Sequence, residues 1–370
     1  MELAFDLENI FDQFEADGGF SGASELGTGH INDTYLIRTA GSGDYVLQRI
    51  NHKVFPDVPG LVNNKVLISN HLREKLSFLP GGELQKRVLT FLPTKSGANF
   101  YVDHDGNHWN LTAHIDGSVS YERVTRKNIA YGAGRLFGEF LHLTTDFDAS
   151  KLIDVIPDFH KMSVRFSQFD AALSAADKER IEKASELISF AQIHRSEMLT
   201  LENLINEGKI AIRATHNDTK ISNALFTADD KPLCVIDTDT VMKGIILFDF
   251  GDAVRTICNT ADEDEADISK VEFELSYFEG FANGFLEAFD GEITDAEAEN
   301  LAFSAKVMTF IIGLRMLTDY LKNDIYFKTA YESHNLDRAK NQFKLVKEID
   351  RNLDKMNRII FGLRSQHGKK

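Results

Sequence analysis

The spacing of apolar residues changes near residue 117, and the two parts of the chain predict different structures. Before this point, short apolar runs rich in β-branched and aromatic residues predict strands. These runs are residues 34–38, 44–50, 88–92 and 109–115. Gly41-Ser42-Gly43 lies between the first two runs and predicts a hairpin turn. One helical pattern, over residues 62–76, interrupts the strands.

After residue 117, apolar residues recur at intervals of three and four, which predicts long helices. We expect the first helix to open at a cap within 120–123, and further helical regions over 178–207 and 269–289. A strand-rich first third followed by a helical remainder predicts an α+β fold with two lobes. The last segment carries a single apolar stripe, made of Leu336, Ala339, Phe343, Val346, Ile349, Leu353, Met356 and Ile360.

Composition narrows the classes of partner. The 370 residues include 41 Lys and Arg against 57 Asp and Glu, a formal net charge of −16. Because this charge repels phosphate backbones and anionic lipids, we expect no nucleic-acid and no membrane partner. Cys234 and Cys258 cannot build a disulfide framework or a zinc knuckle. No secretory signal is visible and no apolar run approaches ~18 residues, so we expect a cytoplasmic protein.

Residues 215–223, Thr-His-Asn-Asp-Thr-Lys-Ile-Ser-Asn, carry the strongest chemical signal. Their spacing, H-x-D-x-K-x-x-N, matches the kinase catalytic-loop pattern H-R-D-x-x-x-x-N. The pattern makes Asp218 the residue that accepts the proton of a substrate hydroxyl. Lys220, two residues later, is placed to hold the transferring phosphoryl group. For His216, a role in bracing the loop is favoured over proton transfer.

A predicted hairpin follows this loop, with strands over 224–226 and 233–236. A hairpin of this length brings Asn223 and Asp237 together at its open end. An amide oxygen and a carboxylate suit Mg²⁺, which prefers hard oxygen ligands. Asp239 adds a second carboxylate near the metal, either as a ligand or as support.

A second acidic group follows in Phe248-Asp249-Phe250-Gly251-Asp252. We expect a buried aspartate here to accept backbone amides of the catalytic loop, rather than to act in catalysis directly. For Arg255, a salt bridge to this acidic group is favoured over contact with a substrate.

Near the amino end, a glycine-containing turn lies between two strand patterns. It contains Gly27, Gly29, His30 and Asn32. Glycines at such a turn let backbone amides approach phosphate oxygens closely. Taken alone the turn fits a plain hairpin, but upstream of a kinase-type loop it becomes the expected phosphate-covering loop.

These motifs together resemble the aminoglycoside phosphotransferase-like branch of the protein-kinase-like fold, and within it the N-acetylhexosamine 1-kinases. The resemblance runs over nearly the whole chain. The segments that carry it are 29–35, 47–51, Phe159-His160, 216–220, 235–242, 318–321 and 334–339. It implies ATP-dependent phosphorylation of the anomeric hydroxyl of GlcNAc or GalNAc, with Mg²⁺ as cofactor.

The resemblance also implies roles for particular segments. It implies a nucleotide-binding lobe over 1–112, a helical lobe with the catalytic loop over 118–370, and a hinge at 113–117. Backbone groups of the hinge, around Ala113 and Ile115, would hold adenine. Asp218 is implied as the base, and Asn223 and Asp237 as the Mg²⁺ ligands. Arg315 would reach the reacting end of the sugar, although an ion pair with Asp319 four residues on is an equally open interpretation.

The chain departs from the general kinase pattern at Gln48, which stands where most kinases carry the phosphate-binding lysine of V-A-I-K. The next helix offers Asn63 and Asn64 in place of the partner glutamate. Losing both members avoids an uncompensated buried charge. Phosphate binding would then depend on the loop from Gly27 to Asn32, on Mg²⁺ and on His30, and Gln48 is counted among the cofactor-binding residues.

Two alternatives remain open from the sequence. One is a kinase of the same family that acts on choline, homoserine, methylthioribose or an aminoglycoside. The other is a nucleotide-binding protein without activity on a kinase fold, which the missing lysine and glutamate favour. The complete set of Asp218, Lys220, Asn223 and Asp237 opposes that second alternative.

Overall fold

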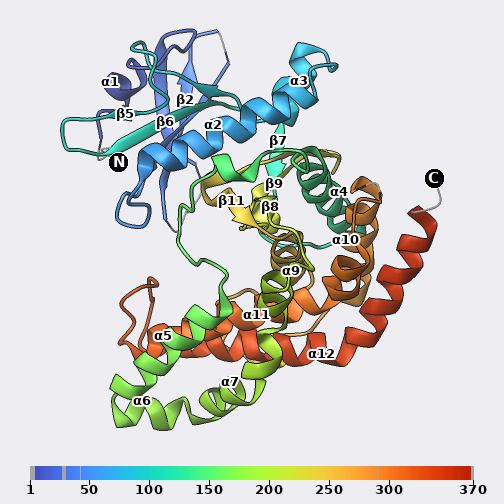
Figure 1. The fold of residues 1–370 in the computed structure, drawn as a ribbon. Coiled ribbons are helices and arrows are strands. Elements are labelled where there is room, and N and C mark those ends of the chain that lie inside the picture. Colours follow the sequence, from blue (N-terminus) through green and yellow to red (C-terminus); the bar gives the residue numbers. More distant parts are fainter. Residues whose placement is uncertain (1–4, 27–30, 42, 290, 368–370) are drawn as a thin grey trace.

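The first third of the chain forms a six-stranded antiparallel sheet (Figure 1). The computed structural model describes residues 5–26, 31–41, 43–289 and 291–367. The strand order is β1-β2-β3-β6-β4, and β5 also pairs with β6. The strands are β1 (Phe20–Glu25), β2 (Asp33–Thr39), β3 (Tyr45–Ile50), β4 (Phe91–Leu92), β5 (Tyr101–Val102) and β6 (His108–Ala113).

The two faces of this sheet pack against different partners. The predicted hairpin is confirmed, since β2 pairs with β3 from Asp33–Arg49 to Ile37–Tyr45. One face is covered by α1 (Leu7–Phe11). On the opposite face, Ile50 packs against α2 (Val58–Lys75), and Gln48 shares its side of β3 because side chains alternate along a strand. The core under α1 consists of Leu7, Ile10, Phe11, Phe14, Tyr35, Ile37, Tyr45, Leu47, Trp109 and Leu111.

Helix α2 joins the sheet to the rest of the molecule. Its first turns pack against Val155 and Met242 from the helical part. The Asn64 side chain donates to the carbonyls of Ile153 and Val241, each at 2.9 Å, and accepts the Ile153 amide at 3.1 Å. Because every polar atom of this buried amide is paired across the junction, the orientation of α2 is fixed relative to both parts.

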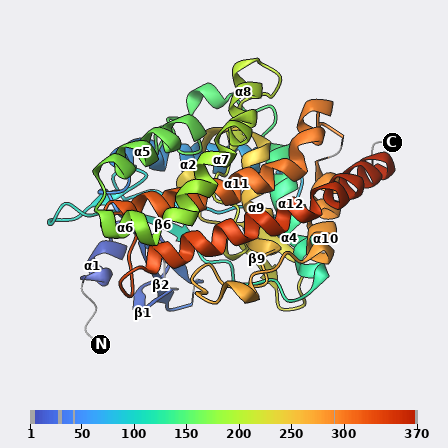
Figure 2. The same cartoon turned by 90° about the horizontal axis from the view of Figure 1, so that it is seen from below.

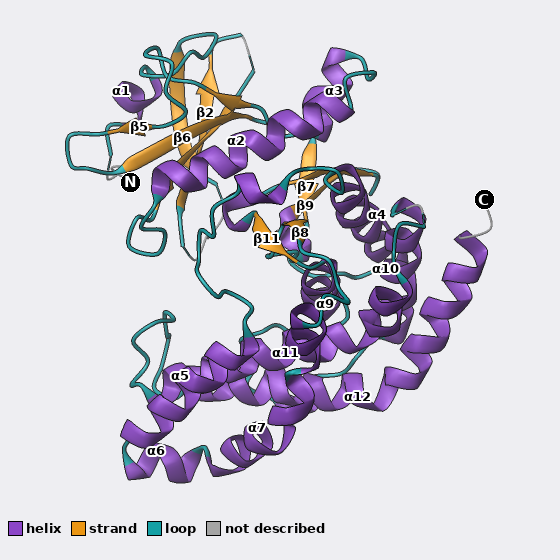
Figure 3. Ribbon diagram, viewed as in Figure 1, coloured by secondary structure: helices purple, strands orange, loops and turns teal. Residues whose placement is uncertain are grey.

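The remainder of the chain is mostly helical, and two small sheets line its upper side in Figure 3. The small sheets are formed by β7 (Ser118–Ser120), β9 (Ala224–Thr227) and β10 (Pro232–Val235), and by β8 (Arg213–Thr215) and β11 (Met242–Gly244). Short helices of three residues occur at 149–151, 221–223, 238–240 and 268–270. A final short helix, α3 (Gly81–Arg87), belongs to the amino-terminal part. The larger helices are α4 (Lys127–Leu143), α5 (Met162–Ala175), α6 (Lys178–Lys183), α7 (Ser185–Met198), α8 (Thr200–Asn206), α9 (Ile246–Ile257), α10 (Leu275–Ala288), α11 (Asp295–Leu321) and α12 (His334–His367).

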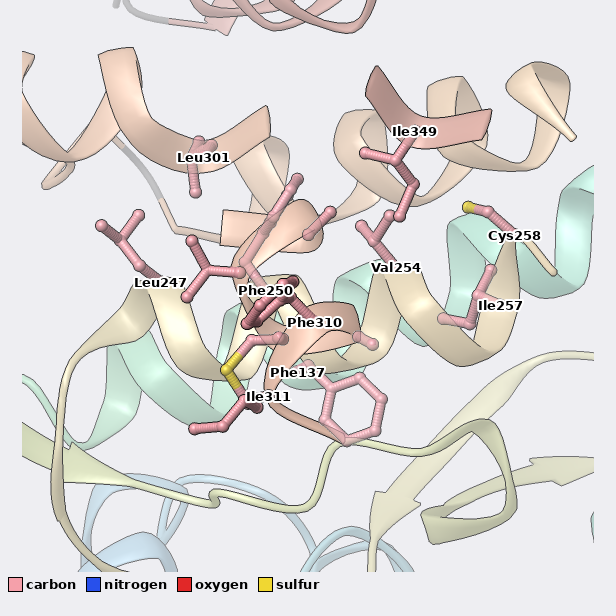
Figure 4. Packing of buried hydrophobic residues seen from close by; sticks show 14 of the residues in the cluster. Phe137, Leu247, Phe250, Val254, Ile257, Cys258, Leu301, Phe310, Ile311 and Ile349 are labelled. Atoms are coloured by element: carbon pink, nitrogen blue, oxygen red, sulfur yellow. The ribbon is translucent and has the colours of Figure 1, made fainter. Parts of the chain in front are cut away.

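One large core holds these helices together. Figure 4 shows Phe250 and Val254 of α9 among Phe310 and Leu301 of α11 and Ile349 of α12. Seen from below in Figure 2, α11 and α12 run alongside each other across the molecule. Within the described part of the chain, α11 is the one helix long and apolar enough to cross a bilayer, and 78% of its apolar window is buried in this core.

Some predicted boundaries are wrong, and each has a local cause. Residues 118–120 are strand β7, with Val119 opposite Phe226, so helix α4 begins only at Lys127 rather than at a cap within 120–123. Pairing with a distant strand therefore outweighs the capping signal. The helical region over 269–289 begins at Leu275, because the Glu274 side chain accepts the Ser276 amide at 3.0 Å and caps the helix there.

The crossing of α4 and α10 requires glycine at the contact. A Cβ on Gly284 would lie 2.1 Å from the Tyr131 carbonyl oxygen, and a Cβ on Gly134 would lie 2.1 Å from the Phe281 carbonyl oxygen. Backbone atoms cannot rotate away, so any side chain here separates the two helices.

We therefore predict that Gly284→Ala lowers the free energy of unfolding by about 1–3 kcal/mol. Gly362→Ala is the matched control, because a Cβ at this exposed position of α12 meets nothing within 4 Å. It should stabilise the chain by about 0.5–1 kcal/mol through helix propensity. Denaturant unfolding of both variants measures the difference, and equal effects would contradict the close crossing.

Candidate active site

The segment after β8 is held in shape by one buried carboxylate. Asp249, in the first turn of α9, accepts the backbone amides of His216 at 2.8 Å and Asn217 at 2.7 Å. The Thr219 hydroxyl donates to the Asp249 carbonyl at 2.6 Å. Burial raises the pKa of Asp249 to about 6, with His216 and the two amides opposing the rise. The prediction that an aspartate in 248–252 braces the loop is confirmed.

His216 also has a structural place. Its Nε2 lies 2.9 Å from the Ile236 carbonyl, and its Nδ1 accepts the Asp218 amide at 3.3 Å. The imidazole thus connects the loop to the start of the segment after β10. Both ring nitrogens are engaged, which agrees with the expected bracing role.

Asp218 projects from this loop beside Lys220 and Asn223. Its Oδ2 lies 3.0 Å from Lys220 Nζ and accepts Asn223 Nδ2 at 3.1 Å. Burial disfavours the charged form, but Lys220 and His216 outweigh it, so the pKa of Asp218 lies below its usual value. Asp218 in turn raises the pKa of Lys220. The carboxylate is therefore ionised and oriented, as an acceptor of a hydroxyl proton must be.

The hairpin β9–β10 brings Asn223 and Asp237 to one place, as its length predicts. The Ile236 amide donates to the Asn223 carbonyl at 2.9 Å, which closes the open end of the hairpin. Asp237 follows in a left-handed backbone conformation, with φ of 59°. Burial, then Asp239 and Asp218, raise the pKa of Asp237 to about 7.

These two residues fit a divalent cation. Within the described residues, the Asp237 carboxylate accepts no hydrogen bond and forms no ion pair, although two other carboxylates lie close enough to raise its pKa. The Asn223 amide donates its N–H groups to Asp218, which leaves its oxygen available. A partly buried anion without a partner beside a free amide oxygen is a donor set that suits Mg²⁺.

Asp239 is engaged differently from Asp237. It is 4% exposed; one carboxylate oxygen pairs with Lys65 of α2, and the other accepts the side-chain amide of Asn32. Asn32 Oδ1 in turn accepts the Asn51 amide at 2.8 Å. With both oxygens occupied by protein groups, these contacts favour the supporting role for Asp239 over the ligand role.

Lys65 was missed by the sequence reasoning. Its ammonium lies 3.0 Å from Gln48 Oε1 as well as against Asp239, and its side chain is buried. The sequence held one signal for it. Lys65 falls in the apolar stripe of α2 between Val62 and Ile68, where a buried lysine requires an acidic partner.

The remaining nucleotide-side residues are only partly described. Gly27, Gly29 and His30 lie outside the described residues, so their predicted role stays a prediction. Ala113 ends β6, and Ile115 follows it, buried at 6% exposure. The Ile115 carbonyl accepts the Ser118 hydroxyl at 2.7 Å, whereas its amide has no partner among the described residues. A free backbone donor of this kind can hold an acceptor nitrogen of a purine.

Aromatic rings and arginines gather around His160, which contacts the loop at Asn217. His160 Nε2 lies 3.2 Å from the Asn217 carbonyl, and the His160 ring packs 4.3 Å from that of Phe159. The Arg315 guanidinium of α11 lies over the Phe159 ring, 5.3 Å from its centroid. Arg315 is therefore linked to the loop through the rings of Phe159 and His160. Burial, with smaller contributions from Arg315 and Arg165, lowers the pKa of His160 to about 3, so the ring is neutral.

The interpretation of Arg315 as a partner of Asp319 is wrong. The Asp319 carboxylate accepts three backbone amides, those of Ile325, Tyr326 and Phe327, at 2.8–3.1 Å. These bonds hold the segment after α11 so that Tyr326 and Phe327 also face Arg315, at 5.8 and 5.5 Å. Among the described residues no carboxylate pairs with the Arg315 guanidinium.

Arg255 is structural. Its guanidinium pairs with Asp252 at 2.9 Å and with Glu263 at 2.7 Å. The preference for a salt bridge over a substrate contact is therefore confirmed. The acidic run 262–265, which contains Glu263, is thereby attached to α9.

Comparison with known proteins decides the family. The profile described as "Phosphotransferase enzyme family" (APH) matches residues 22–282, a range that contains the loop 215–223 and both small sheets. The chain belongs to this phosphotransferase family. The matched range also includes α2 and all of the large sheet except the first two residues of β1.

Solved structures of the family share the fold. An aminoglycoside phosphotransferase from Alicyclobacillus acidocaldarius superposes with a TM-score of 0.59 at 13% identity, covering 98% of each chain. An amicoumacin kinase in complex with AMP-PNP, Ca²⁺ and Ami gives a TM-score of 0.56 at 11% identity, covering 88% of each chain. An ethanolamine kinase from Plasmodium vivax gives 0.53 at 12% identity, covering 87% of this chain and 81% of that one. The expected two-lobed, protein-kinase-like fold is confirmed.

The unpaired charge of Asp237 generates a test. Asp237→Asn should stabilise the metal-free chain at pH 8 by on the order of 1 kcal/mol, because it removes a partly buried anion that has no partner. Addition of MgCl₂ should raise the melting temperature of the parent and leave that of the variant unchanged.

Asp229→Asn is the control, because Asp229 lies on the same hairpin but pairs with Lys231 in solvent. It should change the unfolding free energy by less than about 0.5 kcal/mol and keep the response to Mg²⁺. Thermal unfolding with and without MgCl₂ decides, and an Asp237→Asn variant that still responds like the parent would remove Asp237 from the metal site.

Proposed function

We propose that this phosphotransferase transfers the γ-phosphoryl group of ATP to the anomeric hydroxyl of an N-acetylhexosamine. ATP would bind between the lobes 1–112 and 118–370, with adenine against the hinge 113–117. The family match and the presence of AMP-PNP in the amicoumacin kinase support a nucleotide triphosphate as donor. The sequence resemblance to N-acetylhexosamine 1-kinases supports the sugar.

The residues of the loop have distinct tasks in this reaction. Asp218 accepts the proton of the attacking hydroxyl, and its contacts to Lys220 and Asn223 fix the direction in which it points. Lys220 lies where positive charge can offset the charge that develops on the transferring group. Asn223 and Asp237 would hold Mg²⁺, which supplies charge neutralisation for the donor phosphates.

The observation that carries the choice of acceptor is the unpaired positive charge of Arg315, which is linked to the loop through Phe159 and His160. Arg315 occupies three aromatic faces there, and no described carboxylate neutralises it. Burial and the nearby Arg315 lower the pKa of Arg165 to about 10, so both guanidiniums still carry charge at neutral pH. A cationic acceptor would meet like charge and aromatic rings already covered by Arg315.

A neutral sugar meets the opposite situation. Its hydroxyl and acetamido oxygens are acceptors, which the guanidinium N–H groups can satisfy. Two of the similar structures, an aminoglycoside phosphotransferase and an ethanolamine kinase, are named for acceptors that carry amines. The arginines therefore favour the N-acetylhexosamine over those alternatives.

An inactive nucleotide-binding protein is the less favoured alternative. It rested on the absence of a lysine at Gln48, and Lys65 places an ammonium next to that side chain. The ionised Asp218 beside Lys220 is what an active loop requires.

The direct test is ADP release with Mg·ATP over GlcNAc, GalNAc, galactose, choline, homoserine and an aminoglycoside, with the product identified by phosphorus NMR. We expect a phosphate ester at C1 of an N-acetylhexosamine. Release with choline, homoserine or an aminoglycoside alone would keep the phosphotransfer and refute the sugar. Bound nucleotide without release on any acceptor would support the inactive alternative.

The role of Asp218 has its own test. Asp218→Asn should lower kcat at least ~10²-fold, because the variant keeps the shape of the side chain but cannot accept the hydroxyl proton. Nucleotide affinity should stay within about 3-fold of the parent, since Asp218 faces the acceptor. Steady-state kinetics and calorimetry measure the two quantities, and near-normal turnover would exclude Asp218 as the base.

A further inference from the structure

Gln48 and Lys65 form a pair at the place where the sheet, α2 and the segment after β10 meet. Lys65 Nζ donates to Gln48 Oε1 at 3.0 Å and forms a buried ion pair with Asp239. Lys65 is 4% exposed, so its ammonium is held by these partners rather than by solvent. Gln48 is neutral, so the ammonium beside its side chain comes from α2.

Compared with the general kinase pattern, the cation and its hydrogen-bond acceptor have exchanged places between the strand β3 and the helix α2. In the general kinase pattern, the strand carries the lysine and the following helix carries the acidic acceptor. Here the strand carries the acceptor, the Gln48 carbonyl oxygen, and the helix carries the cation, Lys65. The ammonium consequently lies one hydrogen-bond length from the end of the strand side chain, close to where a lysine at position 48 would place its own.

We propose that Lys65 replaces the missing strand lysine and contacts the phosphates of the bound nucleotide. The inference rests on the proposed function, because it needs a nucleotide in this site. The Lys65 ammonium pairs with Asp239, which is two residues after the candidate metal ligand Asp237 in the chain. Asp239 also binds Asn32, which ends the loop expected to cover the phosphates. Lys65 thus shares its carboxylate partner with Asn32, and that partner is two residues along the chain from Asp237.

A purely structural role would make Lys65 only the counter-ion of Asp239. The two roles differ in one measurable respect. A counter-ion stabilises the chain regardless of ligand, whereas a phosphate contact adds affinity only for ligands that carry phosphates. Comparing a nucleotide with its nucleoside therefore separates them.

The experiment compares Asp239→Asn with the double variant Asp239→Asn, Lys65→Met. The two chains differ only at Lys65. Asp239→Asn leaves the Lys65 ammonium with neutral hydrogen-bond acceptors, Gln48 and the new side-chain amide, and the double variant removes that charge as well. Calorimetry measures the binding of Mg²⁺ with AMP-PNP, and of adenosine, to each. We expect loss of Lys65 to weaken AMP-PNP binding about 10–100-fold, the effect of one charged hydrogen bond. Adenosine affinity should change less than 2-fold.

Two further variants complete the design. Lys75→Met is the control, because Lys75 lies on the same helix but pairs with Asp146 at the surface, and it should bind both ligands as the parent does. Gln48→Lys, Lys65→Met returns the ammonium to the strand and keeps a counter-ion for Asp239. If the position of the ammonium matters, and not whether β3 or α2 carries it, this variant should recover AMP-PNP affinity to within about 5-fold of the parent.

The outcomes are distinct. Equal weakening of AMP-PNP and adenosine, or no change in either, overturns the proposal and leaves Lys65 a structural counter-ion. A folded Gln48→Lys, Lys65→Met chain that does not recover AMP-PNP binding also counts against it. A parent chain that binds neither ligand overturns the proposed function itself, whereas nucleotide binding without dependence on Lys65 overturns this inference alone.

Discussion

The site is built around the repulsion among three carboxylates, Asp218, Asp237 and Asp239. In this partly buried region, each negative charge makes ionisation of its neighbours less favourable. Two lysines offset this repulsion. Lys220 neutralises Asp218 from within the catalytic loop, and Lys65 neutralises Asp239 from α2. One carboxylate, Asp237, is left without a partner among the described residues. Of the three carboxylates, Asp237 alone therefore keeps a charge with which no described side chain pairs.

This arrangement depends on contacts of very different range in the sequence. The pairing of Lys220 with Asp218 is local, and the approach of Asn223 and Asp237 needs only a hairpin. For this reason the loop, the hairpin and the bracing by Asp249 were all predictable from spacing. The pairing of Lys65 with Asp239 spans 174 residues and depends on how α2 packs against the helical part. No spacing rule reports a contact of that kind.

The difference between local and long-range contacts also explains why helices are predicted correctly while some of their boundaries are not. The apolar stripe of the last segment predicted α12 because helical periodicity is a property of neighbouring residues. The start of α4 was mispredicted because Val119 pairs with Phe226, more than a hundred residues away. Arg315 shows the effect in the site itself. The resemblance implies its place at the acceptor end, but the Tyr326 and Phe327 rings that face it come from a segment held by the backbone amides that donate to Asp319.

The placement of Lys65 on α2 has a mechanical consequence. A lysine on a strand is held by the sheet, whereas Lys65 moves with a helix whose orientation is fixed by Asn64 through the carbonyls of Ile153 and Val241. The ammonium, its neutral partner Gln48 and the carboxylate of Asp239 therefore come from the two sides of the junction between the sheet and the helical part. Any displacement of α2 would separate Lys65 from Asp239 and leave a second buried carboxylate unpaired, which is energetically costly. The charge balance of the site thus holds the two parts of the molecule together, and a sequence without the strand lysine still preserves that balance.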